Sequence, residues 1–124
     1  QIKSFNTGIS SSASPVETTI ASFNMDTYQG AYYMVNVIDT TNNQTEFFEC
    51  ISVHDKTDPY ITKYGVILTN NTLGYVGIAT TNNKVNLTYT PIPNINVDVK
   101  VLQHSIGEDL LGINAIDFDS SLID

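Results

Sequence analysis

Hydrophobic and polar residues alternate along most of the chain with a period of two, which is the pattern of strands with one buried face. The alternation is clearest in two places. Val85, Leu87 and Tyr89 alternate with polar residues over 85–90, and three valines do so over 97–101. We predict that both sets face the same core, because a one-residue slip would expose all of their side chains.

Seven segments carry this or a related strand pattern, with turn signals between them. They are TTIASFNMD, GAYYMVNVID, TEFFECISVH, residues 60–68, YVGIATT, residues 85–90 and residues 97–101. GAYYMVNVID is apolar on both faces, which predicts a central strand. In TEFFECISVH, Glu49 shares one face with Phe47 and Ile51. Residues 60, 62, 64, 66 and 68 are expected to share one face of their strand.

The segments between the strands contain residues that favour turns. Asn-Asn pairs begin at residues 42, 70 and 82, and Asn tolerates a positive φ. Asp55 is placed to accept hydrogen bonds from the backbone after it, and Pro59 forces Asp58 to be extended. We therefore predict that residues 55–59 form a turn held by side-chain-to-backbone bonds.

The two ends of the chain lack the strand pattern. Residues 1–17 are interpreted as a polar N-terminal arm, residues 18–107 as the core, and residues 108–124 as a C-terminal tail or edge strand. Ser105 to Glu108 matches a capping box, so a short helix or a loop can follow it. The arm is expected to add to the edge of a neighbouring sheet.

Composition supports a single small β-domain. The chain has 124 residues, and Ile and Val together number 24, against 7 Leu and 5 Ala. Branching at Cβ suits a strand and crowds a helix. We predict an all-β fold, a single β-sandwich or jelly roll of about 7–8 mostly antiparallel strands.

Charge and cysteine content exclude several functions. Thirteen acidic residues oppose five Lys, with no Arg, giving a net charge of −8. Binding to nucleic acid or to anionic lipid is therefore not expected, because both depend on basic residues. No signal peptide or membrane span is recognised. Cys50 is the only cysteine, which excludes an intrachain disulfide.

The candidate reactive groups all have simpler interpretations. Cys50 and His54 lie about 13 Å apart on one strand, too far for a nucleophile and its base. His54, Asp55 and Asp58 could hold a cation, but turn formation explains both acids. We therefore predict no catalytic, cofactor or metal site. The 7 Tyr and absent Trp leave a sugar-stacking face open as an alternative to packing in the core.

A family resemblance rests on several of these segments. They are TTIASFNMD, YYMVNVIDTTNN, the SVHD-x-TD-x-Y-x-x-x-Y core, LGYVG, VNLTYTP and NVDVKVLQHSIG. Together they resemble the small β-domain of tail-fibre-like and other virion surface proteins of marine tailed phages, especially those of cyanobacteria. The core motif falls on His54, Asp55, Thr57, Asp58, Tyr60 and Tyr64. Lys56 stands where such domains often carry Gly, which argues against a positive φ there.

The resemblance implies a non-enzymatic structural or surface module of a phage virion, assembled in the host cytoplasm. Its partners would be further copies of the chain, for example in a trimer, or other virion proteins. The alternatives are a carbohydrate-binding or adhesin module, with a glycan as ligand, and an enzyme. An open groove lined by Tyr would favour the second, and converging titratable groups would favour the third.

Overall fold

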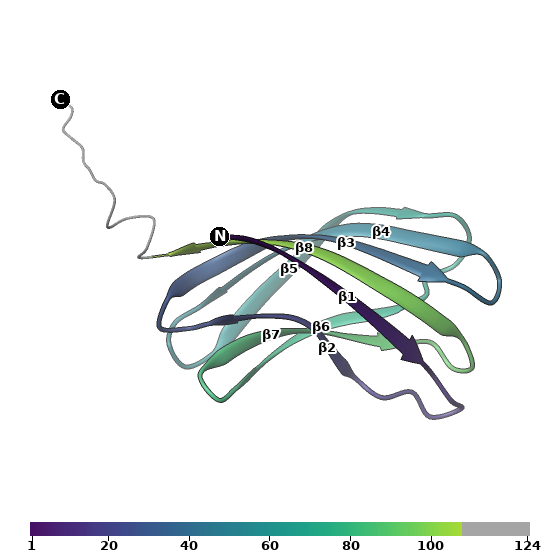
Figure 1. The fold of residues 1–124 in the computed structure, drawn as a ribbon, viewed down its shortest axis with the longest axis horizontal. Coiled ribbons are helices and arrows are strands. Elements are labelled where there is room, and N and C mark those ends of the chain that lie inside the picture. The colour runs from purple at the N-terminus through teal and green to yellow at the C-terminus, as the bar shows by residue number, and fades with distance from the viewer. Residues whose placement is uncertain (108–124) are drawn as a thin grey trace.

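A computed structural model describes residues 1–107, which form eight antiparallel strands in two packed sheets (Figure 1). One sheet has the order β1-β8-β3-β4-β5 and the other β2-β7-β6. The strands are β1 (Ile2–Ser10), β2 (Thr18–Asn24), β3 (Tyr28–Asp39), β4 (Gln44–His54), β5 (Pro59–Leu68), β6 (Gly74–Thr81), β7 (Lys84–Pro91) and β8 (Asn96–Gly107). The predicted all-β sandwich is confirmed, and β3 is the central strand of the larger sheet, as its pattern indicated.

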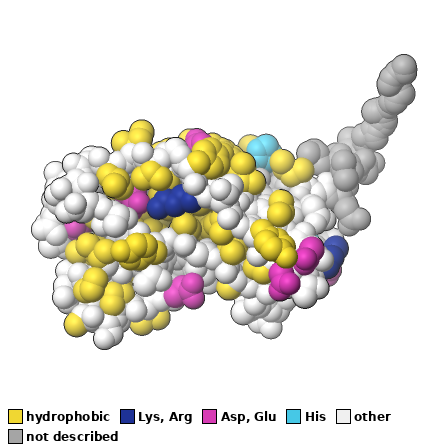
Figure 2. All heavy atoms as spheres, turned by 180° about the vertical axis from the view of Figure 1, so that it is seen from behind, with side chains coloured by type: hydrophobic (Ala, Val, Ile, Leu, Met, Phe, Trp, Pro, Cys, Tyr) yellow, Lys and Arg dark blue, Asp and Glu magenta, His cyan; other side chains and the backbone are white. Residues whose placement is uncertain are grey.

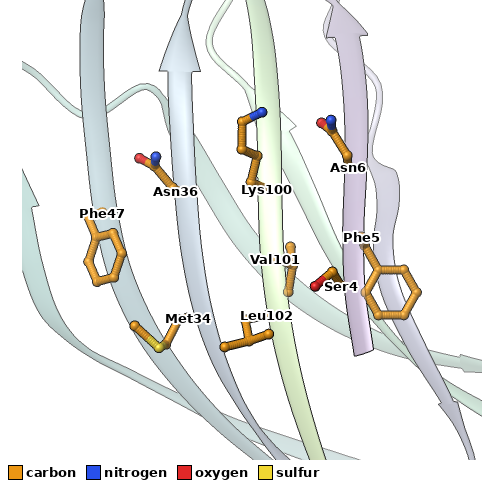
Figure 3. Close-up of a pocket in the computed structure, with 9 residues that line it drawn as sticks. All are labelled: Ser4, Phe5, Asn6, Met34, Asn36, Phe47, Lys100, Val101 and Leu102. Atoms are coloured by element: carbon orange, nitrogen blue, oxygen red, sulfur yellow. The ribbon is translucent and has the colours of Figure 1, made fainter. Parts of the chain in front are cut away.

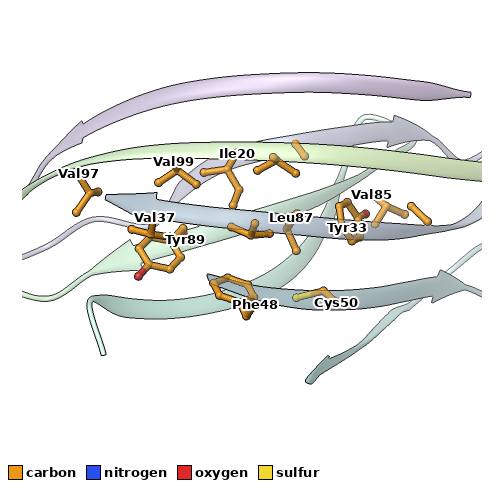
Figure 4. Packing of buried hydrophobic residues seen from close by; sticks show 14 of the residues in the cluster. Ile20, Tyr33, Val37, Phe48, Cys50, Val85, Leu87, Tyr89, Val97 and Val99 are labelled. Carbon is orange, nitrogen blue, oxygen red and sulfur yellow. The ribbon is translucent and has the colours of Figure 1, made fainter. Parts of the chain in front are cut away.

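The hydrophobic core lies between the two sheets (Figure 4). The alternating residues of β7 and β8 face it together, as predicted, and all six are buried: Val85, Leu87, Tyr89, Val97, Val99 and Val101. From the central strand, Tyr33, Val35 and Val37 join them with no exposed surface. The period of two therefore sets which side chains fill the sandwich.

The first ten residues differ from the expected arm. Residues 2–10 form β1, which pairs with β8 of the same chain from Ile2 opposite His104 to Ser10 opposite Asn96. Phe5 and Ile9 are half-buried and pack against the core. β1 is therefore an edge strand of the larger sheet, and its backbone groups are already paired on one side.

The side chains of β5 do not keep to one face along the whole strand, contrary to expectation. A bulge lies opposite Phe48, where Gly65 has φ +61° and both Gly65 and Val66 face one residue of β4. Before the bulge, Tyr60, Thr62 and Tyr64 point away from the core. After it, Leu68 lies opposite the buried Glu46, so the alternation is shifted by one residue.

Asparagine forms several of the turns as predicted. Asn82 and Asn83 have φ of 49° and 63° and make a two-residue turn between β6 and β7. Asn43, with φ 56°, closes the β3–β4 turn. The pair at residue 70 bends the chain without a positive φ. Lys56 has φ 76°, so the expectation against a positive φ there is wrong.

A buried carboxylate links the two sheets at the β5–β6 edge. Glu46 has no exposed surface, and its Oε1 accepts hydrogen bonds from the Leu73 amide and the Tyr89 hydroxyl, each at 3.1 Å. Its Oε2 lies 3.4 Å from Lys63 Nζ and accepts from the Thr72 hydroxyl. β4, β5, β7 and the 69–73 segment therefore converge on one side chain.

The predicted C-terminal tail, residues 108–124, lies outside the described residues. Of the capping-box residues, Ser105 to Gly107 belong to β8. Among residues 1–107 there is no helix that could cross a membrane.

Candidate functional site

The core motif of the resemblance occupies the β4–β5 turn and the start of β5. Asp55 Oδ1 accepts hydrogen bonds from the amides of Thr57 and Asp58, at 3.0 and 2.7 Å. These backbone bonds lower the pKa of the Asp55 carboxyl. The prediction of a turn held by side-chain-to-backbone bonds is confirmed.

His54 faces inward from the end of β4. Its Nε2 lies 2.7 Å from the Tyr28 carbonyl oxygen, and its Nδ1 accepts a hydrogen bond from the Lys56 amide. The ring also packs near Phe23. Both ring nitrogens therefore contact backbone groups, and His54 links the β4–β5 turn to the start of β3. Residues 1–107 hold no cluster of three metal-ligating side chains.

Cys50 is buried in the core beside Phe48 on β4, as Figure 4 shows. Burial raises the pKa of its thiol to about 12, although the charge of Lys63 acts in the opposite direction. Such a thiol is not a nucleophile near neutral pH. His54 lies on the same strand, four residues away, and has its own backbone partners.

The surface that stands out is the side of the five-stranded sheet that points away from the three-stranded sheet, here called the outer face. Most of the exposed large hydrophobic side chains lie on it, together with half-buried residues of β3 and β4. Its apolar members are Ile2, Tyr32, Met34, Ile38, Phe47, Ile51, Val53, Tyr60, Tyr64, Ile67, Leu102 and Ile106. Figure 2, seen from the side of β5 and β6, shows hydrophobic side chains in patches and few basic ones.

Shallow grooves run across the outer face. One of about 440 Å³ spans β1, β8, β3 and β4, with Met34, Phe47 and Leu102 among its lining residues (Figure 3). A second of about 370 Å³ lies where β3, β4 and β8 meet, lined by Tyr32, Ile51, Val53 and Ile106 among others. These grooves offer apolar surface to an occupant without enclosing it.

A polar row crosses the first groove. Asn6, Lys100 and Asn36 lie opposite one another on β1, β8 and β3 (Figure 3). Within the described residues, Asn36 Oδ1 is buried and has no hydrogen-bond partner, and Lys100 has no ion pair. A buried acceptor without a donor is costly, so the row is suited to a partner that supplies one.

A second polar feature lies at the β4–β5 side of the outer face. The Tyr32 hydroxyl donates a 2.8 Å hydrogen bond to Glu49 Oε2, and this bond is the largest cause of the raised pKa of Tyr32. Tyr64 lies directly opposite Glu49, and its pKa is raised by burial and then by the Glu49 charge. Two of the seven Tyr thus flank one carboxylate.

Sequence reasoning placed Phe47, Glu49 and Ile51 on one face, but it did not identify the groove residues. Asn6, Asn36 and Lys100 are 30 to 94 residues apart in the chain and meet only through the β1-β8-β3 order. The sequence signal that could have indicated this surface was the apolar pattern on both faces of β3. The outward-facing apolar residues of that pattern include Tyr32 and Met34.

No protein-family model and no curated protein matches the chain. Among solved structures, the fold is similar to part of the tailspike protein of Acinetobacter phage vB_ApiP_P1, with a TM-score of 0.65 and 14% identity. The match covers 82% of this chain and 21% of that one, so the chain spans about a fifth of the tailspike.

Two further tailspikes match less closely. The tailspike of Acinetobacter baumannii phage AM24 matches with a TM-score of 0.45 and 10% identity, over 86% of this chain and 26% of that one. The tailspike gp49 of A. baumannii bacteriophage Fri1, described as a capsular polysaccharide depolymerase, matches with a TM-score of 0.45 and 13% identity, over 86% of this chain and 18% of that one. The class that the fold defines is an all-β sandwich similar to part of a phage tailspike.

Proposed function

We propose that the chain is a non-enzymatic structural or surface module of a phage virion, as part of a tail fibre, tailspike or other surface protein. The observation that carries the proposal is the fold similarity to part of the vB_ApiP_P1 tailspike. The resemblance of the motif segments to marine phage virion domains supports the same class of protein. The two candidate reactive side chains are consistent with this proposal, because Cys50 is buried in the core and His54 contacts the backbone with its ring nitrogens.

In this proposal the module associates with other copies of itself or with other virion proteins. An apolar outer face on a chain of net charge −8 supports such an association. Large exposed apolar patches on a small domain usually mark an interaction surface. Nucleic acid and membranes are not among the proposed partners.

The virion assignment is tested by asking whether the chain is encoded beside virion genes and is present in phage particles. Genes flanking the coding sequence should encode capsid or tail proteins, and antibodies against the chain should label the tail or surface of the purified phage particles in electron micrographs. Flanking genes for metabolism, together with unlabelled particles, would contradict the virion assignment.

A carbohydrate-binding module is the second candidate, and the Tyr32–Glu49–Tyr64 group favours it. A Tyr ring offers a sugar an apolar face with a polar hydroxyl at its end, and a carboxylate can accept hydrogen bonds from sugar hydroxyls. A glycan array should then show binding that Tyr64→Ala abolishes while Tyr75→Ala, an exposed Tyr on β6, does not. Absence of binding to any glycan would remove this candidate.

A further inference from the structure

We infer that the outer face of the five-stranded sheet is an interface for a second copy of this chain, packed face to face. The inference deepens the proposed function, because it rests on the association of the module with further copies and names the surface. Met34 and Tyr32 give the central strand an apolar outer side, the pattern of a strand covered on both faces.

The size of the outer face fits a stable dimer. Five strands spaced about 4.8 Å apart, with about ten residues of about 3.3 Å each, give a face of roughly 800 Å². A standard protein interface buries about 800 Å² on each partner. Two such sheets can pack at about 10 Å, with their apolar side chains between them.

Charge is also low on this face. Of the eight acidic residues within 1–107, Glu49 and Asp98 lie on the outer face, and Lys100 is its one Lys in the same range. Glu49 is half-buried and is already bonded to Tyr32. Depletion of charge in the centre of a patch distinguishes interfaces from ordinary surface.

The polar groups of the face are complementary to themselves under a two-fold axis. An axis parallel to β3 places β8 over β4 of the second copy, because β8 and β4 flank β3. Asn36 then meets Asn36 of the second copy, and each amide N–H can donate to the other Oδ1. This arrangement supplies the donor that the buried Asn36 Oδ1 lacks within the chain.

The same axis gives Lys100 a partner. Lys100 lies on β8 in register with Asn36, so it comes over Phe47 on β4 of the second copy. Glu49 is the next outward-facing residue of β4, two positions from Phe47. The two Lys100–Glu49 contacts are equivalent by symmetry, as in a closed two-fold interface. Apolar contacts of Met34, Leu102 and Phe47 surround them.

The test is the mass of the full 124-residue chain in solution. Light scattering after size exclusion, over 1–100 μM, should give about twice the 13.6 kDa chain mass. Lys100→Glu should weaken the dimer at least tenfold, and adding Glu49→Lys to it should restore the dimer. Lys84→Glu makes the same charge change on β7, outside the outer face, and should leave the dimer intact.

A second pair of variants tests the apolar part of the face. Leu102→Arg should give a monomer, whereas Val16→Arg, an exposed position outside the sheets, should not. Circular dichroism and the urea midpoint check that each variant is folded. A wild-type monomer at 100 μM, or a dimer that survives both Lys100→Glu and Leu102→Arg, overturns the inference. Neither result alters the particle composition that tests the virion assignment.

Discussion

Lys56 has a backbone conformation that residues with a Cβ rarely adopt. Its φ of 76° lies in the left-handed region, where the side chain crowds the following carbonyl. Three contacts keep it there: its amide donates to His54 Nδ1, its Nζ donates to the Met25 carbonyl at 3.3 Å, and Asp55 fixes the residues after it. The turn therefore determines the conformation of Lys56.

Lys56→Gly should raise the free energy of unfolding by about 0.5–1 kcal/mol, because glycine has no strain at a positive φ. Urea unfolding at neutral pH measures this. Lys56→Ala is the matched control, since it removes the Nζ contact and keeps the Cβ, and it should not stabilise the chain. A loss of stability in Lys56→Gly would show that the Met25 contact outweighs the strain.

Cys50 should behave as a buried hydrophobic residue. The native chain should react with a thiol reagent at pH 8 far more slowly than the unfolded chain, because burial raises the pKa of the thiol to about 12. Cys50→Ala should cost about 1 kcal/mol through a small cavity. An exposed thiol at Ser14→Cys in the Cys50→Ala chain provides the fast reference. Equal rates for the two thiols would contradict the buried position.

At the scale of elements, the β4–β5 turn should lose stability in acid. The pKa of Asp55 is lowered by backbone hydrogen bonds, so its contribution is present above the ordinary Asp pKa of about 3.9 and is lost as the pH falls through the lower folded value. Asp55→Asn keeps a side-chain acceptor without a charge.

This variant should therefore show a smaller fall in the urea midpoint than the wild type between pH 5 and pH 2. Asp58→Asn is the control in the same turn, because its carboxylate accepts no hydrogen bond from residues 1–107. Identical pH profiles for Asp55→Asn and the wild type would show that the Asp55 charge does not stabilise the turn.

Glu46 should be the most sensitive carboxylate of the described chain. Glu46→Gln replaces an acceptor-only group with an amide whose NH2 group faces either the Leu73 amide N–H or Lys63 Nζ, which can only donate, so at least one buried bond is lost. We expect a loss of about 1–3 kcal/mol in urea unfolding. Glu17→Gln, at an exposed carboxylate with one hydrogen bond, should change stability by less than about 0.5 kcal/mol.

Strand identity could be predicted from the sequence wherever a period of two was strong. β7 and β8 show this best, because only one orientation of each strand buries its alternating apolar residues. β1 was missed because its inward side carries only two large apolar residues, Phe5 and Ile9, and its pairing partner β8 lies some 90 residues away. The β5 bulge was missed because one extra residue at Gly65 leaves no mark in the hydrophobic pattern.

The candidate site was harder to predict than the strands for a related reason. The alternation of β4 places Phe47, Glu49 and Ile51 on one face, but only the strand order brings Asn36 and Lys100 beside them. The Glu46 contacts likewise join residues 17 to 43 positions apart. Local pattern fixes the direction of a side chain, and non-local pairing fixes its neighbours.

At the scale of the whole molecule, β1 closes the larger sheet. Its nine residues pair with β8, and the segment after it is tied to the β7–β8 connection, where Ser11 accepts from and donates to Ile95. Without β1, β8 would become an edge with a long row of free N–H and C=O groups. The part of the core that Phe5 and Ile9 of β1 cover would also be exposed.

Deleting residues 1–10 should therefore lower the urea midpoint by more than Phe5→Ala and Ile9→Ala combined, and should promote aggregation as the concentration rises. Each single substitution removes half-buried apolar surface and should cost about 1–2 kcal/mol, while the deletion also removes the β1–β8 hydrogen bonds. The urea midpoint and light scattering of the three variants, measured side by side, separate packing from strand pairing. If the deleted chain keeps the wild-type midpoint and stays in solution, the first ten residues are a dispensable arm and β8 can serve as the edge of the sheet.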